Sequence, residues 1–197
     1  MSIVVQHEKR RKEILEKALT VFVNDGFHDT TFQRIADRCS ITRTTLYLYF
    51  KNKQEIFNYS IKQMLAKFEE KINIIRVDAS FDSVEKITRV MLDIFKMLEQ
   101  NRRLLSVVLD YLLHLPKNEN NPEQRIRRRT VRLRHILSFI VIEGIKAGEL
   151  KKVKIKVVYD YLYSIIIAAI FHLTVFKKKN LDELKEMTIF SVKQFAA

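Results

Sequence analysis

The sequence predicts an all-α protein, because helix breakers are rare and apolar residues recur at helical spacing. Only three of the 197 residues are Gly and two are Pro, which leaves long stretches free to form helices. Hydrophobic residues make up 47% of the chain, too many for an intrinsically disordered protein. No segment alternates apolar and polar residues as a half-buried strand would. We expect an N-terminal three-helix unit with a helix-turn-helix, followed by a C-terminal helical core.

A first helix is expected over residues 8–24, because apolar side chains recur there on one helical face. Gly26 suits the position just after this helix, with Phe27 as its apolar partner. Thr30 and Gln33 fit a capping box, in which the Thr30 hydroxyl accepts the Gln33 amide. This box is expected to start a short second helix.

The remaining segments are expected to be helical as well. The expected helices cover residues 53–76, 82–99, 102–115, 122–147, 153–176 and 181–196. Asn52 and Asn180 suit the N-caps of the helices that follow them, and Pro116 and Gly148 should end the helices before them. In the last helix the apolar residues expected to face inward are Leu181, Leu184, Met187, Phe190 and Phe195.

Residues 35–49 have the spacing of a helix-turn-helix. Ala36 is small where two helices would cross closely, Ile41 is apolar in the turn, and Leu46 and Tyr49 would anchor the second helix. Thr42 is a good N-cap for that helix. Its other faces would carry Arg43, Thr44, Thr45, Tyr47 and Leu48. These residue types suit contacts to bases and phosphates, although an ordinary helical hairpin has similar spacing.

The stretch from Thr30 to Phe57, TTFQRIADRCSITRTTLYLYFKNKQEIF, resembles the DNA-binding domain of the TetR family of transcriptional regulators. The resemblance extends over about residues 8–59 and is most specific at I-A-D and T-L-Y-L-Y-F. It implies DNA binding by residues 1–52, and ligand binding and dimerisation by residues 53–197.

The implied function is that of a sequence-specific transcriptional repressor, released from a palindromic double-stranded DNA operator by a small hydrophobic or amphipathic ligand. The resemblance also implies a cytoplasmic homodimer, whose interface is formed by the two helices expected over residues 153–176 and 181–196.

Eight residues are implied to contact DNA: three near base edges, three at phosphates, and two at the start of the preceding helix. In that order they are Arg43, Thr44 and Thr45; Tyr47, Tyr49 and Lys53; and Thr31 and Gln33. Ser40 stands where the family usually has Gly, and a left-handed backbone there would cost about 1 kcal/mol. Thr44 also replaces a frequent Gly, so an operator cannot be carried over from relatives.

The formal net charge of +13 favours a polyanionic partner. Residues 1–55 hold ten Lys and Arg against seven Asp and Glu, so most of the surplus lies outside the expected DNA-binding unit. The surplus would increase non-specific attraction to DNA, serve an anionic ligand, or simply keep the protein in solution.

Arg129, in a basic cluster over residues 125–134, falls on an apolar helical face. A cation facing an apolar cavity would suit an amphipathic anion such as a fatty acid or an acyl thioester. The alternatives are an internal partner such as Asp110, or a side chain that extends to solvent. Eight further residues would line a ligand cavity or simply fill a core or an interface. They are Met64, Phe68, Met91, Phe95, Tyr111, His114, Tyr163 and His172.

Other functional classes find less support in the sequence. It has no H-E-x-x-H motif, no Gly-rich phosphate loop and no Cys/His arrangement, so we expect no enzyme, cofactor or metal site. Its single cysteine, Cys39, excludes a disulfide framework. The uncharged run at residues 161–176 is shorter than the roughly 20 residues of a spanning helix, so no membrane association is expected. A ligand-independent or architectural DNA-binding protein remains the alternative.

Overall fold

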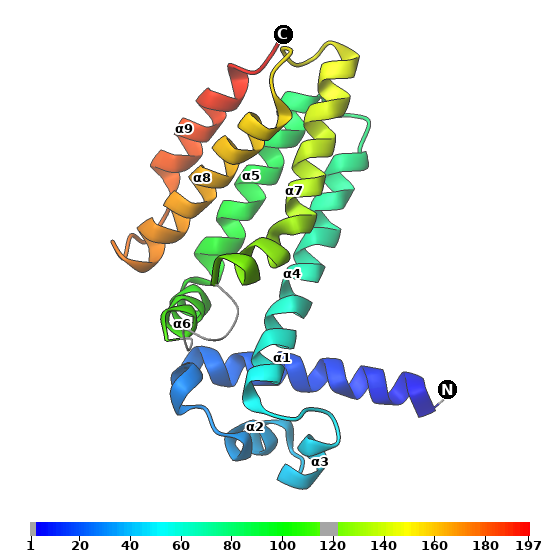
Figure 1. Ribbon diagram of the computed structural model, residues 1–197, viewed down its shortest axis with the longest axis vertical. Coiled ribbons are helices and arrows are strands. Elements are labelled where there is room, and N and C mark those ends of the chain that lie inside the picture. The colour runs from blue at the N-terminus through cyan, green and yellow to red at the C-terminus, as the bar shows by residue number, and fades with distance from the viewer. Residues whose placement is uncertain (1–2, 115–121) are drawn as a thin grey trace. The chain divides into compact units, whose positions relative to one another are not determined.

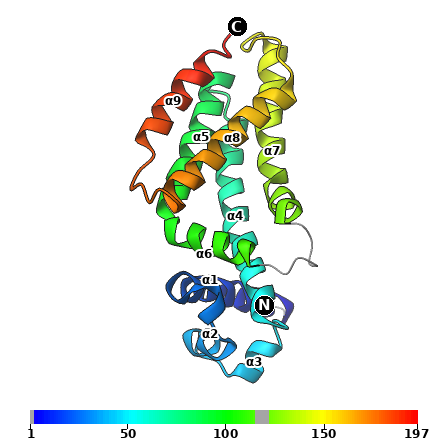
Figure 2. The same ribbon diagram turned by 60° about the vertical axis from the view of Figure 1, so that its left-hand side comes forward.

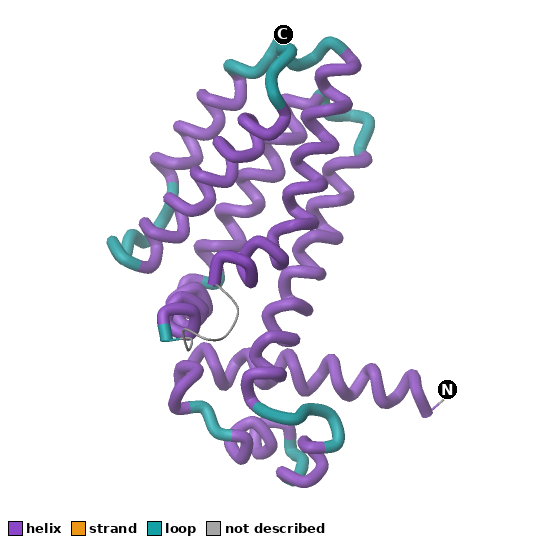
Figure 3. Tube along the Cα trace, in the orientation of Figure 1, coloured by secondary structure: helices purple, strands orange, loops and turns teal. Residues whose placement is uncertain are grey.

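The structure, a computed structural model, describes the backbone of residues 3–114 and 122–197, and the side-chain surroundings of residues 5–114 and 131–197. Within these ranges it forms nine helices and no strand, which confirms the all-α prediction (Figure 3). The helices are α1 (Ile3–Asp29), α2 (Phe32–Cys39), α3 (Arg43–Tyr47), α4 (Lys53–Val77), α5 (Ser83–Gln100), α6 (Arg102–Leu113), α7 (Pro122–Ala147), α8 (Ile155–Thr174) and α9 (Asp182–Lys193).

The chain divides into two compact units. Among the described residues, unit 1 comprises 3–68 and 106–114, and unit 2 comprises 69–105 and 122–197. Helices α4 and α6 therefore each contribute residues to both units. The predicted domains, residues 1–52 for DNA binding and 53–197 for ligand binding and dimerisation, were assigned by function, and that assignment stays a prediction.

Unit 1 is built on α1, which packs against α2, while α2 packs against α3 (Figure 1). An aromatic cluster forms its core next to the end of α1. The Phe22 ring meets the Phe57 ring edge-on at 4.9 Å, and the Phe27 and Tyr111 ring centroids are 4.5 Å apart. These contacts hold the start of α4 and the end of α6 against α1.

The starts of α2 and α3 are set by threonine hydroxyls, and α2 starts one residue later than expected. The N-cap of α2 is Thr31, whose Oγ1 accepts the Arg34 amide at 3.2 Å, so the predicted capping box is wrong. Thr30 instead donates its hydroxyl to the Gly26 carbonyl at 2.6 Å. Gly26 interrupts α1 with a φ of 81°, a conformation that favours glycine.

The turn between α2 and α3 has the predicted geometry. Ser40 adopts the left-handed conformation, with φ 55° and ψ 47°, and so carries the strain expected of a residue other than Gly. Thr42 is confirmed as the N-cap of α3, because its Oγ1 accepts the Thr45 amide at 3.0 Å.

Unit 2 is a helical bundle in which α5 packs against α7, α8 and α9 (Figure 2). The inner face of α5 carries Ile87, Met91 and Phe95, all fully buried. Gly144 on α7 lies so close to α5 that an added Cβ would be 2.5 Å from the Ser83 Oγ. The small residue at this position therefore permits close packing of the two helices.

The end of the chain differs from the expectation in two ways. The N-cap of α9 is Leu181, not Asn180, and the Leu181 amide is bound by the Glu99 carboxylate of α5 at 2.8 Å. Leu181 and Leu184 are buried as predicted, but Met187 and Phe190 are 63% and 69% exposed. They lie on the outer face of α9, so the inward orientation predicted for these two residues is wrong.

Among the described helices, α8 is long and apolar enough to cross a membrane by length and composition, with a mean hydropathy of 1.6. Only 33% of its most apolar window is buried within the chain. The core helix of a soluble protein meets the same criteria, and so does a helix in an interface between subunits.

Candidate DNA-binding surface

The helix-turn-helix scaffold is buried on one side and exposed on the other. Ile35 and Ala36 of α2 and Leu46 of α3 are completely buried, in a region where α2 packs against both α1 and α3. The geometry predicted for the two helices and their turn is therefore present. Because Leu46 points inward, the remaining faces of α3 are directed to solvent.

The exposed face of α3 carries two side chains that contact each other. Arg43 donates from Nη2 to the Tyr47 hydroxyl at 3.2 Å, and its guanidinium lies 5.6 Å from the centre of the Tyr47 ring. The Tyr47 ring stacks on Phe32 of α2, with centroids 4.4 Å apart. Tyr47 is thereby held in place while its hydroxyl remains available at the surface.

Thr44 is exposed beside Arg43, whereas Thr45 is half-buried and shares a hydrogen bond of 2.8 Å with the Thr42 hydroxyl. Leu48, directly after α3, is 75% exposed. Leu48 is not among the predicted contact residues, although the sequence already places this apolar side chain on an outer face of the helix. An exposed leucine here has the chemistry to pack against a thymine methyl group.

The other predicted DNA contacts surround α3. Thr31 and Gln33 are both exposed at the start of α2, and Gln33 donates from Nε2 to the Asp37 carboxylate at 2.7 Å. Tyr49 is half-buried, and its ring stacks on His7 of α1 at 4.5 Å. These positions are compatible with phosphate contacts, which stay predictions.

The Lys53 side chain forms its hydrogen bonds within unit 1. Its ammonium donates to the carbonyl oxygens of Phe27, His28 and Thr30 at 2.9, 2.7 and 3.0 Å. Partial burial lowers the pKa of Lys53 from its ordinary value, while the nearby Asp29 carboxylate opposes that shift. An ammonium has three N–H donors, and here all three have partners. A contact between this ammonium and a DNA phosphate would therefore require it to leave at least one of these carbonyls, and the contact stays a prediction.

The predicted ligand residues are distributed over both units. Met64, Phe68, Tyr111 and His114 belong to unit 1, and Met91, Phe95, Tyr163 and His172 to unit 2. In unit 2, Met91 and Phe95 are fully buried, and the Tyr163 ring stacks on Tyr159 at 5.7 Å. The His172 ring meets Phe176 edge-on at 5.5 Å. Neither unit alone contains all eight predicted ligand residues, so neither forms the predicted ligand cavity from the full set.

An ion pair between Asp110 and Arg129 was one of the alternatives, and the structure describes only the Asp110 side of it. The Asp110 carboxylate lies 3.6 Å from His28 Nε2 and 3.2 Å from His114 Nδ1, so its partners in unit 1 are histidines. The side chain of Arg129 lies outside the described residues.

Helices α8 and α9 expose an apolar surface. Its members are Val157, Tyr161, Ile167, Phe171, Met187 and Phe190. A groove of about 380 Å³ runs between the two helices and is lined mainly by apolar side chains, among them Val157, Tyr161 and Phe190. Contiguous apolar surface of this kind is typical of an interface with another protein surface.

The buried scaffold and the polar outer face of α3 define a helix-turn-helix DNA-binding protein. Residues 14–59 match the sequence model of the family described as bacterial regulatory proteins, tetR family. The fatty acid metabolism regulator protein of Bacillus subtilis (strain 168) is 29% identical over 147 residues, which are 74% of each chain. The DNA-binding part of the chain thus matches the TetR family, and the relative found over most of the chain is a regulator and not an enzyme.

Solved structures have the same fold over nearly the whole chain. A TetR transcription regulator from Haloarcula marismortui superposes with a TM-score of 0.79 at 20% identity, covering 96% of this chain and 97% of that one. The transcriptional regulator FadR from Bacillus subtilis, crystallised in complex with stearoyl-CoA, superposes with a TM-score of 0.74 at 24% identity. That match covers 91% of this chain and 96% of the FadR chain.

Proposed function

We propose that this regulator is a homodimeric repressor that reads a palindromic operator with α3 and leaves it when a small amphipathic ligand binds. The observation that carries the proposal is the exposed face of α3. Arg43, Thr44 and Tyr47 are presented there on a scaffold whose other side is buried. Arg and Thr are residue types that discriminate base edges in the major groove.

The exposed apolar surface of α8 and α9 supports dimerisation. Two copies of α3 would have to lie about 34–36 Å apart, or a multiple of that distance, to enter successive major grooves on one face of DNA. A dimer would also remove Met187, Phe190 and the neighbouring exposed residues of α8 from water. An isologous dimer of this kind would match a palindromic operator.

An anionic amphiphile, such as a fatty acid or an acyl thioester, is the proposed ligand class. The surplus of positive charge outside residues 1–55 would favour an anionic head group. The apolar interior of unit 2, with Met91 and Phe95, would suit an acyl chain. The similarity to a fatty acid metabolism regulator and to a protein crystallised with stearoyl-CoA supports the same class.

Selection of bound fragments from random double-stranded DNA tests the repressor proposal. We expect enrichment of one palindromic sequence, followed by repression of a reporter gene that carries this sequence in its promoter. Enrichment of no sequence, with equal affinity for unrelated duplexes, would instead support the architectural alternative. Activation of the reporter would contradict repression while leaving sequence-specific binding intact.

The ligand class is tested on the selected operator with amphiphiles of equal chain length and anionic, neutral or cationic head groups. We expect only the anionic compounds to raise the melting temperature and release the DNA. The variant Arg129→Met should weaken this response if the guanidinium binds the head group. Release by cationic compounds alone would contradict the proposal, and an unchanged anion response in Arg129→Met would remove that residue from the site.

A further inference from the structure

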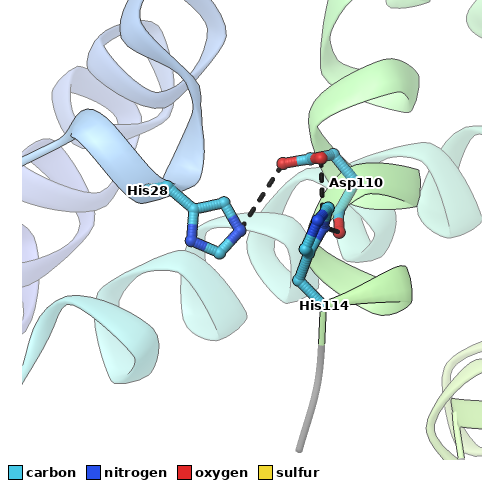
Figure 4. A group of neighbouring side chains, drawn as sticks. All are labelled: His28, Asp110 and His114. Carbon is cyan, nitrogen blue, oxygen red and sulfur yellow. Dashed lines mark hydrogen bonds and ion pairs between the residues drawn. The ribbon is translucent and has the colours of Figure 1, made fainter.

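Three side chains with metal-binding groups meet on the surface of unit 1. His28 lies near the end of α1, and Asp110 and His114 lie one turn apart on or just after α6 (Figure 4). One ligand atom from each side chain falls within 4.8 Å of the other two. The three side chains are each about half exposed, so an ion could reach them from solvent.

The distances are close to those that a bound ion requires. With zinc–ligand bonds of roughly 2.0–2.1 Å and tetrahedral geometry, two ligand atoms on one ion are about 3.3 Å apart. Asp110 Oδ2 is 3.6 Å from His28 Nε2, and Asp110 Oδ1 is 3.2 Å from His114 Nδ1, so each histidine lies near a different oxygen of the carboxylate. His114 Nδ1 also lies 2.9 Å from the Asp110 carbonyl oxygen, so ion binding at Nδ1 would replace that contact by a metal–nitrogen bond.

The backbone that carries these side chains is held by contacts within unit 1. Phe27 and Tyr111, the neighbours of His28 and Asp110, are buried and lie 4.5 Å apart between ring centroids. Gln54 donates to the Tyr111 hydroxyl at 2.9 Å. The Lys53 ammonium donates to the His28 carbonyl at 2.7 Å. Ligands on such packed elements need little rearrangement to bind an ion.

We propose that His28, Asp110 and His114 form a binding site for a divalent transition-metal ion, for which zinc is the best match. Two imidazoles and one carboxylate are a ligand set that zinc prefers, and the fourth position would hold water. The ion would join the end of α1, which leads directly into the helix-turn-helix, to α6. This inference goes beyond the proposed repressor function and does not depend on it.

A calorimetric titration of the full-length, tag-free protein with zinc chloride tests the site. We expect one zinc ion per chain in the wild type. His28→Ala and His114→Ala should each weaken zinc binding by at least about tenfold. Loss of a residue that only hydrogen-bonds a metal ligand already costs about that much affinity, and loss of the ligand itself should cost no less. The control His135→Ala removes an exposed histidine of α7, outside the cluster, and should leave the affinity unchanged.

A second measurement separates this site from non-specific binding. Zinc should raise the melting temperature of the wild type and of His135→Ala, but not of His28→Ala or Asp110→Asn, because only a folded-state site stabilises the fold. Circular dichroism checks that the variants are folded without zinc. Absence of saturable binding, or full wild-type affinity in both His28→Ala and His114→Ala, would overturn the proposal.

Discussion

Arg43 and Tyr47 have different expected roles although they contact each other. A guanidinium is able to bind a guanine edge through two hydrogen bonds, whereas the Tyr47 hydroxyl is suited to a phosphate. The two side chains lie next to each other on the outer face of α3 and share a hydrogen bond of 3.2 Å, but each has its own expected partner in DNA. Substitutions at these two positions should therefore affect DNA binding in different ways.

We expect Arg43→Ala to relax base preference at one operator position by about 1–3 kcal/mol, because a bidentate base contact is lost. Tyr47→Phe keeps the ring that stacks on Phe32 and removes only the hydroxyl, so it should weaken binding to all sequences alike. Affinities for a panel of single-base operator variants measure both effects. Unchanged selectivity in Arg43→Ala would remove this residue from base recognition.

Lys53 is expected to stabilise unit 1. Lys53→Met deletes three charge-assisted hydrogen bonds to backbone carbonyls and leaves those carbonyls without this partner. The free energy of unfolding should fall by about 2 kcal/mol, the scale of hydrogen bonds to a charged group. Denaturant unfolding measures the loss, with Lys51→Met, at an exposed residue, as the control.

The salt dependence of DNA binding tests whether Lys53 contacts DNA instead of stabilising unit 1. If Lys53→Met leaves stability unchanged and instead flattens the slope of affinity against salt concentration, the ammonium binds a phosphate in the complex. In that case it would have to leave the three carbonyls on binding.

At the scale of elements, α9 depends on α5 for its start. Leu181 provides no capping side chain, and the Glu99 carboxylate accepts the Leu181 amide and pairs with Lys185 at 2.8 Å. Glu99→Ala should lower the free energy of unfolding by about 1–2 kcal/mol, the typical cost of a lost cap. Glu99→Gln, which retains an acceptor, should lower it less. Chemical denaturation measures both, with Glu186→Gln on the exposed face of α9 as the control.

The same contact has an expected pH dependence. The hydrogen bond to Glu99 is the main cause that raises the pKa of Lys185 above its ordinary 10.5. A raised pKa means that the stabilisation is fully present below pH 10.5 and is lost as the pH rises through the folded-state pKa. The stability difference between wild type and Glu99→Gln should therefore stay constant up to pH 10.5 and shrink as the pH rises further, through the folded-state pKa of Lys185. A constant difference would show that the charge of Lys185 contributes nothing.

At the scale of the whole molecule, the apolar surface of α8 and α9 should determine assembly. Ile167→Asp places a charge in this surface, and a charge buried in an interface without a partner opposes association. We expect monomers by light scattering and much weaker operator binding, since two joined reading units bind DNA far more tightly than one. Removal of residues 181–197 should have the same effect.

The matched control for this prediction is Ile74→Asp, which places the same charge at an exposed apolar residue of α4. It should remain dimeric. A dimeric Ile167→Asp protein would place the interface elsewhere, and Met187 and Phe190 would then need another partner.

The helices could be predicted from the sequence because each one depends on local chemistry. Apolar periodicity and the near absence of Gly and Pro were enough for the fold class, and Thr42 and Asn52 were correctly predicted as N-caps. The exposed face of α3 also followed, since Leu46 had to be buried. Thr30 and Thr31 are equivalent caps by sequence, and only the backbone after Gly26 decides between them.

What the sequence by itself determined is therefore the set of helices, the helix-turn-helix and the DNA-binding class. Only the tertiary structure decided where long-range partners meet. Glu99 caps α9 from 82 residues away, the Lys53 ammonium turns to carbonyls at the end of α1, and His28 meets Asp110 and His114. The physical reason is that helix propensity and capping act over a few residues, whereas these contacts depend on how distant helices pack.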